Sequence, residues 1–278
     1  MIDLHAHILP DLDDGARDWD ETLAMCTLAR DDGIHTIVAT PHIKPGVYSP
    51  SRALIFKKVA ELNARLTAHR SSLPSSGVKS ETLEVTPHDS RFTVHALTVL
   101  PGADNSFEPD ILRQIENGVA LTIGADFLSP NSLPSTDIFR YVLLELSDYF
   151  LFPQVKDCIR KLREKNIVPI LSHPERNAMI QKNYKLLGEL IQAGALSQVT
   201  AMSVTGEFGK EIKKLTRTLI KKNLVHIIAT DAHSKDQRPP ILSRAVSEAA
   251  DLIGSEKAAS MVQGIPQAII KGKEIDIT

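Results

Sequence analysis

The sequence QVKDCIRKLREKNIVPILSH, residues 154–173, holds the pattern that decides the fold, because a helix leads directly into a buried strand. Residues 154–166 place apolar side chains three or four positions apart, which predicts an amphipathic helix. Residues 167–172 form a short apolar run, which predicts a strand buried on both faces. Another apolar run at 139–146 predicts a strand before the helix. The three segments together predict a strand–helix–strand unit of a parallel sheet.

The same alternation extends along the rest of the chain. Further helices are expected at 19–32, 50–69, 112–117, 184–193, 210–222, 241–253 and 256–263. Further strands are expected at 35–40, 93–100, 120–123, 196–202 and 225–230. About seven strands with helical crossovers, and no strand-rich segment set apart, favour a closed or nearly closed α/β barrel within a single domain, residues 1–278. The polar stretch 71–91 is expected to be a surface excursion from that domain.

The composition is that of an ordinary globular protein. The chain has 278 residues, 42% of them hydrophobic, and a formal net charge of −2. This balance argues against a dedicated nucleic-acid-binding protein, which normally carries a basic excess or stripe. The densest basic run, residues 210–222, is expected to be the solvated face of a helix.

The compartment expected from the sequence is the cytoplasm. Residues 1–20 lack the basic stretch and uninterrupted apolar run of a signal peptide. No segment has the roughly 18 uncharged apolar residues that cross a bilayer, so no membrane insertion is expected. Cys26 and Cys158 lie in helical patterns, and two thiols in so long a chain indicate a reducing compartment rather than a disulfide scaffold.

Side chains with metal-ligating chemistry occur where the expected strands end. They are His5, His7, His42, Asp104, His173, Asp231 and His233. In a parallel α/β barrel, the carboxyl ends of the strands converge on one face, where active sites are built. We therefore expect these side chains to share one site.

The pair His5 and His7 is the most informative part of this set. Residues two apart in an extended segment point the same way, so both imidazoles can reach one metal ion. A single histidine at a strand end is more often a hydrogen-bonded core or surface residue than a ligand. Here the pair recurs as Asp231-x-His233, and this repetition favours ligation.

Carboxylates that could bridge two cations are available at Asp14, Asp104 and Asp231. Asp14 alone is weaker, because LDDG at 12–15 equally predicts a turn or the start of a helix. Mixed imidazole and carboxylate ligation suits Mn, Fe or Zn. The other histidines are expected to be ordinary core or surface residues: His35, His69, His88, His95 and His226.

Longer motifs identify a resemblance to a known family. They are MIDLHAHILP (1–10), LDDGA (12–16), ATPH (39–42), LPGAD (100–104), LSHPER (171–176), QVTAMSVTGEFG (198–209) and IATDAHSKDQRPP (228–240). In this order they resemble the polymerase-and-histidinol-phosphatase (PHP) superfamily. Within it, the chain is similar to the bacterial protein-tyrosine phosphatases associated with capsule and exopolysaccharide synthesis. The resemblance extends from His5 to about Lys273.

The resemblance implies a distorted (β/α) barrel that holds three divalent ions, usually Mn²⁺, with Fe, Co or Zn as alternatives. Its ligand sets, carried onto this sequence, would be His5, His7, Asp104 and Asp231; Asp104 and His173; and Asp14, His42 and His233. Arg176 and Arg238 match the arginines that grip phosphate. The implied substrate is phosphotyrosine on a protein such as an autophosphorylating bacterial tyrosine kinase.

Such a site suits phosphomonoester hydrolysis. Two or three cations polarise the phosphoryl oxygens, lower the pKa of water to generate an attacking hydroxide, and stabilise the leaving oxygen. Arginine adds bidentate recognition of the phosphate. A cysteine-based tyrosine phosphatase needs an arginine six residues after its thiolate. Asp32 and Glu164 stand there instead, after Cys26 and Cys158, so that mechanism is excluded.

The chain departs from the family pattern in three places. Asp104 stands where glutamate is usual and reaches about one methylene less far; Met202 stands where glycine is common; and the excursion at 71–91 is longer than usual. The alternatives are a small-molecule phosphatase such as histidinol phosphatase, and a weakly active metal-binding regulator of a kinase. A nucleic-acid proofreading module is disfavoured by the acidic balance and the absence of a polymerase domain.

Overall fold

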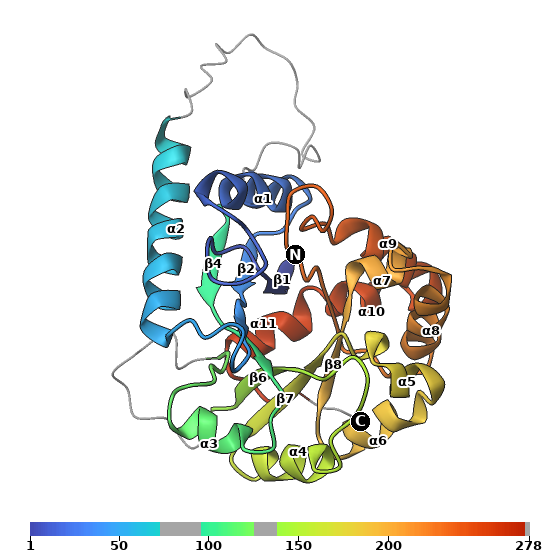
Figure 1. The fold of residues 1–278 in the computed structure, drawn as a ribbon. Helices are drawn as coiled ribbons and strands as arrows, with labels where there is room; N and C mark the ends of the chain where they lie inside the picture. Colours follow the sequence, from blue (N-terminus) through green and yellow to red (C-terminus); the bar gives the residue numbers. More distant parts are fainter. Residues whose placement is uncertain (73–95, 125–137, 276–278) are drawn as a thin grey trace.

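The computed structural model describes residues 1–72, 96–124 and 138–275, in which parallel strands alternate with helices (Figure 1). The strands are β1 (Ile2–Ala6), β2 (Thr36–Ala39), β3 (His42–Ile43), β4 (Thr98–Pro101), β5 (Asp104–Ser106), β6 (Arg140–Glu145), β7 (Ile167–Ser172), β8 (Leu196–Thr200) and β9 (Ile227–Ala229). The α-helices are α1 (Trp19–Asp31), α2 (Arg52–Ser72), α3 (Ile111–Glu116), α4 (Val155–Arg163), α5 (Ala178–Lys182), α6 (Lys185–Gln192), α7 (Ala201–Thr205), α8 (Lys210–Lys221), α9 (Ser243–Ile253), α10 (Ser255–Ser260) and α11 (Gly264–Ile270). A short 3₁₀ helix, η3 (Pro174–Arg176), follows β7.

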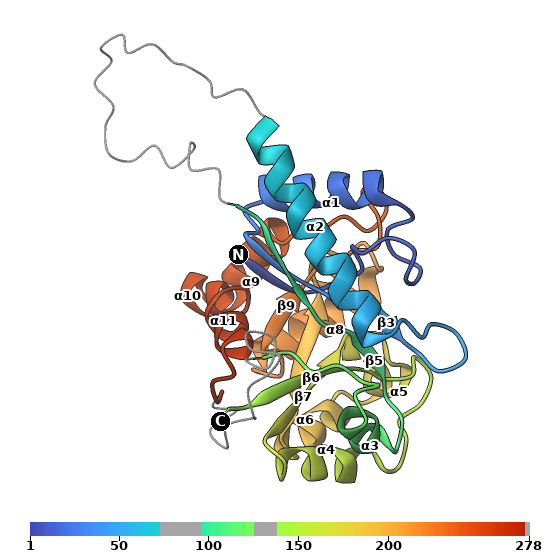
Figure 2. The same cartoon turned by 90° about the vertical axis from the view of Figure 1, so that its left-hand side faces the viewer.

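The strands form two parallel sheets that adjoin one another. Their orders are β1-β2-β4 and β3-β5-β6-β7-β8-β9. After a short interruption β2 is followed by β3, and β4 by β5; a parallel bridge between Ala6 and Ala232 joins β1 to the segment after β9. The predicted α/β fold with about seven parallel strands is confirmed, and its distortion lies at these interruptions. In Figure 2, β3 and β5 lie on the side away from the two marked termini.

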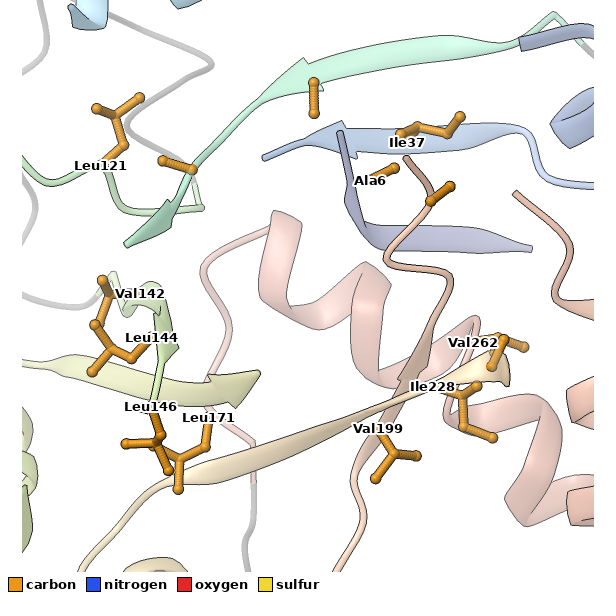
Figure 3. Close-up of a cluster of buried hydrophobic side chains, with 14 of the residues drawn as sticks. Ala6, Ile37, Leu121, Val142, Leu144, Leu146, Leu171, Val199, Ile228 and Val262 are labelled. Atoms are coloured by element: carbon orange, nitrogen blue, oxygen red, sulfur yellow. The ribbon is translucent and has the colours of Figure 1, made fainter. Parts of the chain in front are cut away.

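Alternate residues of the central strands β6 and β7 pack into two different hydrophobic clusters, as the two-residue period of a strand requires. The inner cluster includes Leu143 of β6 and Ile170 of β7, with Ile269 of α11 packed among them. The outer cluster lies between the strands and the helices and includes Val142, Leu144, Leu171, Val199 and Ile228 (Figure 3). Both faces of the sheet are therefore buried, which explains the nearly continuous apolar runs in the sequence.

Two buried polar side chains connect strands to neighbouring segments of the chain. The Nδ2 group of Asn105 donates to the carbonyl oxygens of Leu121 and Leu143, both at 3.0 Å, and its Oδ1 accepts from the Leu121 N–H at 3.1 Å. Asp3 accepts hydrogen bonds from the backbone N–H and the hydroxyl of Thr230. Burial raises the pKa of Asp3 to about 6. These bonds fix the positions of β5 and of the residues after β9.

The structure corrects several sequence expectations. The strand expected at 196–202 ends at Thr200, because Ala201–Thr205 forms α7, so Met202 is helical. Helix α7 ends at Gly206, whose φ of 104° suits glycine. Residues 120–123 contribute one antiparallel bridge, between Ile123 and Tyr141, instead of a strand. His226 precedes β9 and does not lie within it.

Some expectations fall on residues outside the described ranges. Of the strand expected at 93–100, the structure describes only 96–100, and Thr98–Pro101 is extended as β4. The excursion expected at 71–91 lies outside the described residues except for 71–72, which end α2. Among the helices in the described ranges, none is long and apolar enough to cross a membrane.

Replacing Asn105 with alanine should destabilise the fold, because it leaves buried backbone groups of Leu121 and Leu143 without partners. The expected loss is roughly 2–4 kcal/mol, since each unsatisfied buried group costs about 1–3 kcal/mol. Urea denaturation of the metal-free protein measures it. The control is Gln114→Ala on α3, where the amide is exposed, and its change should stay below about 0.5 kcal/mol. Equal stabilities for the two variants would contradict this role of Asn105.

Candidate metal centre

The polar residues predicted to share a site do come together at the carboxyl ends of the strands. His5 lies in β1, and His173 directly follows β7. His42 and Asp104 follow the carboxyl ends of β2 and β4 after short interruptions, and they begin β3 and β5. Asp231 and His233 follow β9. This convergence is the geometric consequence of a parallel sheet. All of these side chains are buried.

His5 and His7 point toward one position, as the HxH spacing predicts. Their Nε2 atoms are 3.0 Å apart. Two nitrogens that bind one cation at about 2.1 Å are separated by roughly 3–3.5 Å, so this distance suits ligands of a shared ion.

In three histidines, the Nδ1 atom, which is the ring nitrogen other than Nε2, lies within hydrogen-bond distance of an acceptor. His5 Nδ1 lies 2.9 Å from Gln198 Oε1, His7 Nδ1 lies 2.6 Å from Asp13 Oδ2, and His233 Nδ1 lies 2.8 Å from the backbone oxygen of Asp231. These acceptors require the proton on Nδ1. In neutral His5 and His233 the Nε2 lone pair therefore faces the site, and in His7 the Nε2 atom is the one that a metal ion would bind, which is the arrangement typical of metal-ligating histidines.

Asp231 connects the histidines to two arginines. Its Oδ1 is 3.3 Å from His5 Nε2 and 3.4 Å from His7 Nε2. Its Oδ2 accepts a hydrogen bond from Arg176 Nη2 at 2.7 Å and another from Arg238 Nη2. Burial alone would raise the pKa of Asp231, but His5 and Arg176 outweigh burial and hold this pKa well below its usual range. Asp231 is therefore ionised at neutral pH.

Asp104 is the centre of a second group. Its Oδ2 is 3.5 Å from both His5 Nε2 and His42 Nδ1, and 3.8 Å from His173 Nε2. Its Oδ1 accepts from Ser172 Oγ at 3.1 Å. Burial, and next the negative charge of Glu145, raise the pKa of Asp104 well above its usual value. A nearby cation would remove this penalty.

Three buried atoms around Asp104 have no hydrogen-bond partner among the described residues. They are Asp104 Oδ2, His42 Nδ1 and Glu145 Oε2. His42 Nδ1 lies 3.5 Å from Asp104 Oδ2 and 3.7 Å from Glu145 Oε2. Buried polar atoms are normally satisfied, and an absent ion is one recognised cause of an exception. The donor set of oxygen and imidazole nitrogen fits a divalent cation.

A third group lies nearer the solvent. Ligand atoms of His7, Asp14, His42 and His233 lie within 4.8 Å of one another. Asp14 Oδ1 is 3.6 Å from His42 Nε2 and 3.7 Å from His233 Nε2. Asp14 is half exposed, so the turn suggested by LDDG and a place beside the histidines are compatible.

Burial controls the protonation of most of these histidines. It lowers the pKa of His5 to about 3, that of His42 to about 4 and that of His233 to about 2. They are therefore neutral at pH 7, which is the form that binds metal. For His7 the effect of burial is outweighed by Asp13 and Asp231, which raise its pKa to about 10. A cation at His7 Nε2 would take the place of that proton.

All three groups border one pocket of about 250 Å³. Its lining residues are Asp14, His42, Lys44, Val47, Tyr48, Glu145, Asp148, His173, Arg176, Asp231, His233 and Arg238. Both predicted phosphate-binding arginines therefore share a cavity with five of the eight predicted metal ligands: Asp14, His42, His173, Asp231 and His233. A small anionic ligand in this pocket would meet the guanidinium groups and the metal groups together.

Sequence reasoning missed two residues of the site, Glu145 and Asp13. Glu145 ends β6 and interrupts the apolar run VLLEL, the same signal that identified the other residues, but it lay within the expected strand. Asp13, beside Asp14, holds His7 instead of facing the pocket.

The histidines expected to be ordinary residues include two whose surroundings are described. His35 Nδ1 lies near the hydroxyl of Thr36 at 3.0 Å, and His226 Nδ1 accepts from the Ser197 N–H at 3.1 Å. Neither belongs to the groups of potential metal ligands found among the described residues. The side chain of His69, and all of His88 and His95, lie outside the described part of the chain.

Comparison with known proteins identifies the family. The sequence model of the capsular polysaccharide synthesis family CpsB/CapC matches residues 1–74 and 72–271. The chain belongs to this family. The branch predicted from the HPER, SVTGEFG and DAHSKDQRPP motifs is therefore confirmed.

Relatives of known structure and name agree with this assignment. The chain is 33% identical over 238 residues to the tyrosine-protein phosphatase YwqE of Bacillus subtilis, covering 86% of this chain and 79% of YwqE. It is 27% identical over 275 residues to the tyrosine-protein phosphatase CpsB of Streptococcus pneumoniae, covering 97% and 98% of the two chains.

A solved structure gives the same result. It comes from work on YwqE and CpsB, described as unique metal-dependent tyrosine phosphatases. It superposes with a TM-score of 0.81 at 30% identity and covers 99% of this chain and 96% of its own. The fold and the arrangement of strands are thus shared over nearly the whole length.

Replacing Asp104 with the isosteric asparagine should have opposite effects on metal binding and on stability. The variant should bind at least one ion fewer per chain, because a buried carboxylate between three histidines is lost. The metal-free variant should be more stable than the metal-free wild type at pH 7.5, because like-charged Asp104 and Glu145 no longer face each other. Metal analysis and urea denaturation of chelated protein measure the two effects. Wild-type stoichiometry in the variant would show that Asp104 is not a ligand.

Proposed function

We propose that this protein is a metal-dependent phosphomonoesterase that removes phosphate from tyrosine residues of proteins. The observation that carries the proposal is Asp231, whose one oxygen faces His5 and His7 while the other is bound by two arginines. A site for cations and a site for an anionic group thus adjoin each other in one pocket. The phosphatase names of YwqE and CpsB support the same conclusion.

The ions are divalent and three in number in this proposal, with Mn²⁺ as the metal and Fe, Co or Zn able to replace it. The ligands are His5, His7, Asp104 and Asp231 for one ion, Asp104 and His173 for the second, and Asp14, His42 and His233 for the third. Glu145 adds a carboxylate beside Asp104 and His42. When bound, such ions polarise the phosphoryl oxygens and lower the pKa of water.

Arg176 and Arg238 bind the phosphate in this proposal. Both guanidinium groups lie over the ring of Phe208, with their Cζ atoms 5.5 and 5.9 Å from its centroid. Asp231 accepts one N–H from each, and their buried Nε atoms have no hydrogen-bond partner among the described residues. Two like charges are thus held side by side in a position where a phosphate can neutralise both.

The arginines act on the phosphate, and the carboxylates act on the histidines. Arginine N–H groups orient the phosphate and stabilise the charge on its oxygens in the transition state. The carboxylates of Asp104 and Asp231 keep the histidines in place and offset positive charge. The substrate in this proposal is a bacterial tyrosine kinase of capsule or exopolysaccharide synthesis, and the reaction takes place in the cytoplasm. The family to which the chain belongs supports this choice.

Chelation should abolish hydrolysis of an aryl phosphate, and added Mn²⁺ should restore it. Iodoacetamide should have little effect, because both cysteines are buried and burial raises the pKa of Cys26 to about 12. Release of the phenol, followed by absorbance, measures the rate. Activity that survives exhaustive chelation but is lost on alkylation would refute the metal mechanism.

Arg176→Ala and Arg238→Ala should each lower kcat at least tenfold, because losing a charge-assisted contact to a transition-state oxyanion costs about 2–4 kcal/mol. Metal content should stay near the wild-type value, since the ligands remain. Arg160→Ala, on the exposed surface of α4, is the matched control and should retain wild-type kcat. Full activity in both pocket variants would mean that the phosphate binds elsewhere.

A further inference from the structure

The pocket of the candidate metal centre has an apolar part that the proposed chemistry does not use. Almost every side chain in its lining carries a carboxylate, an imidazole, an ammonium or a guanidinium group. The exceptions are two neighbours in the sequence, Val47 and Tyr48. Val47 is 61% exposed and is among the few large hydrophobic residues of the described part that face solvent. An exposed apolar side chain at the edge of a charged pocket suggests contact with a ligand.

A tight turn holds these two residues over the pocket. The Lys44 N–H donates to the Tyr48 carbonyl at 2.8 Å, and the Tyr48 N–H donates to the Lys44 carbonyl at 2.9 Å. The Val47 N–H also donates to the Lys44 carbonyl, at 3.0 Å. Pro45 and Gly46 occupy the centre of this turn, and the φ of 79° at Gly46 is the value that a type II turn requires there. Lys44 Nζ, at the base of the turn, is 3.8 Å from Glu145 Oε2.

The turn places an aromatic ring beside the metal ligands. The rings of Tyr48 and His42 are stacked, with centroids 5.9 Å apart and planes inclined by 13°. His42 belongs to the same group of potential ligands as Asp14 and His233. Arg176 and Arg238 line the same pocket. A ligand that fills the pocket would therefore have its anionic end among arginines and ligands, and Val47 and Tyr48 beside the group that carries the anion.

The geometry points to an aryl subsite formed by Val47 and Tyr48, which receives the ring of phosphotyrosine while the arginines hold its phosphate. Aromatic rings gain from apolar and aromatic neighbours, beyond the area that they bury. A phosphoserine or another short polar alkyl phosphate would leave the subsite empty. The inference rests on the proposed function, and it makes this turn the element that selects aryl over alkyl phosphates.

The test compares Tyr48→Leu and Val47→Ala with the wild type, all loaded with Mn²⁺. The substrates are one peptide phosphorylated on tyrosine and the same peptide with phosphoserine at that position. Each variant should lower the ratio of the two kcat/KM values by roughly three- to tenfold, as expected for the loss of one aromatic or apolar contact. Tyr48→Phe keeps the ring and should retain most of the ratio.

A binding measurement separates recognition from turnover. Calorimetry with phenylphosphonate and methylphosphonate should show a preference of the wild type for the aryl compound, and this preference should fall in both variants. Metal analysis of each protein shows whether replacing Tyr48, which stacks on His42, also changes metal binding. Val47→Ala leaves the Tyr48 ring in place, so its effect on the ratio is independent of that stacking. Val119→Ala, exposed near α3 and outside the pocket lining, is the control and should change neither ratio nor preference.

The outcomes distinguish the subsite from the proposed function. Unchanged ratios and unchanged phosphonate preference in both variants, with normal hydrolysis of phosphotyrosine by the wild type, would overturn the subsite alone. Absence of hydrolysis by the wild type would overturn the proposed function, and the phosphonate preference would still decide the subsite. Hydrolysis of histidinol phosphate faster than phosphotyrosyl peptide would count against both.

Discussion

The carboxylate of Asp231 is the interaction on which the rest of the site depends. Two arginines that would repel each other lie side by side because both donate to its Oδ2. Its Oδ1 faces His5 of β1 and His7 just after β1, and its backbone N–H donates to the carbonyl of His5 at 2.8 Å. One side chain thus sets the distance between the proposed metal and phosphate positions, so that neither can be moved without the other.

Backbone strain is concentrated where these groups meet. His173 and Asp231 both have positive φ, 35° and 53°, although neither is glycine or asparagine. Such conformations persist only when the surroundings impose them. The surroundings of His173 impose its conformation, because Glu175, two residues later, is held in place. Glu175 accepts hydrogen bonds from the Thr200 N–H at 3.0 Å and from the Ser203 hydroxyl at 2.6 Å. The turn that carries His173 and Arg176 is thereby attached to β8 and α7.

Much of this site could be predicted from the sequence, because its residues obey simple local rules. HxH in a strand and polar residues at the ends of apolar runs determine which side chains meet, once the sheet is parallel. Glu145 and Asp13 were not predicted as site residues, because the local sequence around them is equally typical of a strand and of a turn. Where β8 ends, the Thr200 N–H donates to Glu175, which is distant in sequence. Long-range contacts of this kind leave no local pattern.

The interruptions after β2 and β4 could not be predicted from the local sequence either. Pro41 and Gly102 could each have ended a strand, but the chain resumes as β3 and β5 in the second sheet. A Cβ at Gly102 would lie 2.6 Å from Val38 Cγ1, so the close approach there requires glycine. The resumed strands are the ones that carry His42 and Asp104. The distortion of the fold therefore delivers two of its candidate ligands.

The two thiols have a consequence for how such a protein responds to its surroundings. Enzymes that use a reactive thiolate are switched off by peroxide, which oxidises sulfur to sulfenic acid in a reversible way. Cys26 and Cys158 are buried, and burial raises the pKa of both. Neither is placed among the candidate ligands or in the lining of their pocket. Oxidation at cysteine would therefore leave this site untouched, in contrast to a phosphatase whose nucleophile is a thiolate.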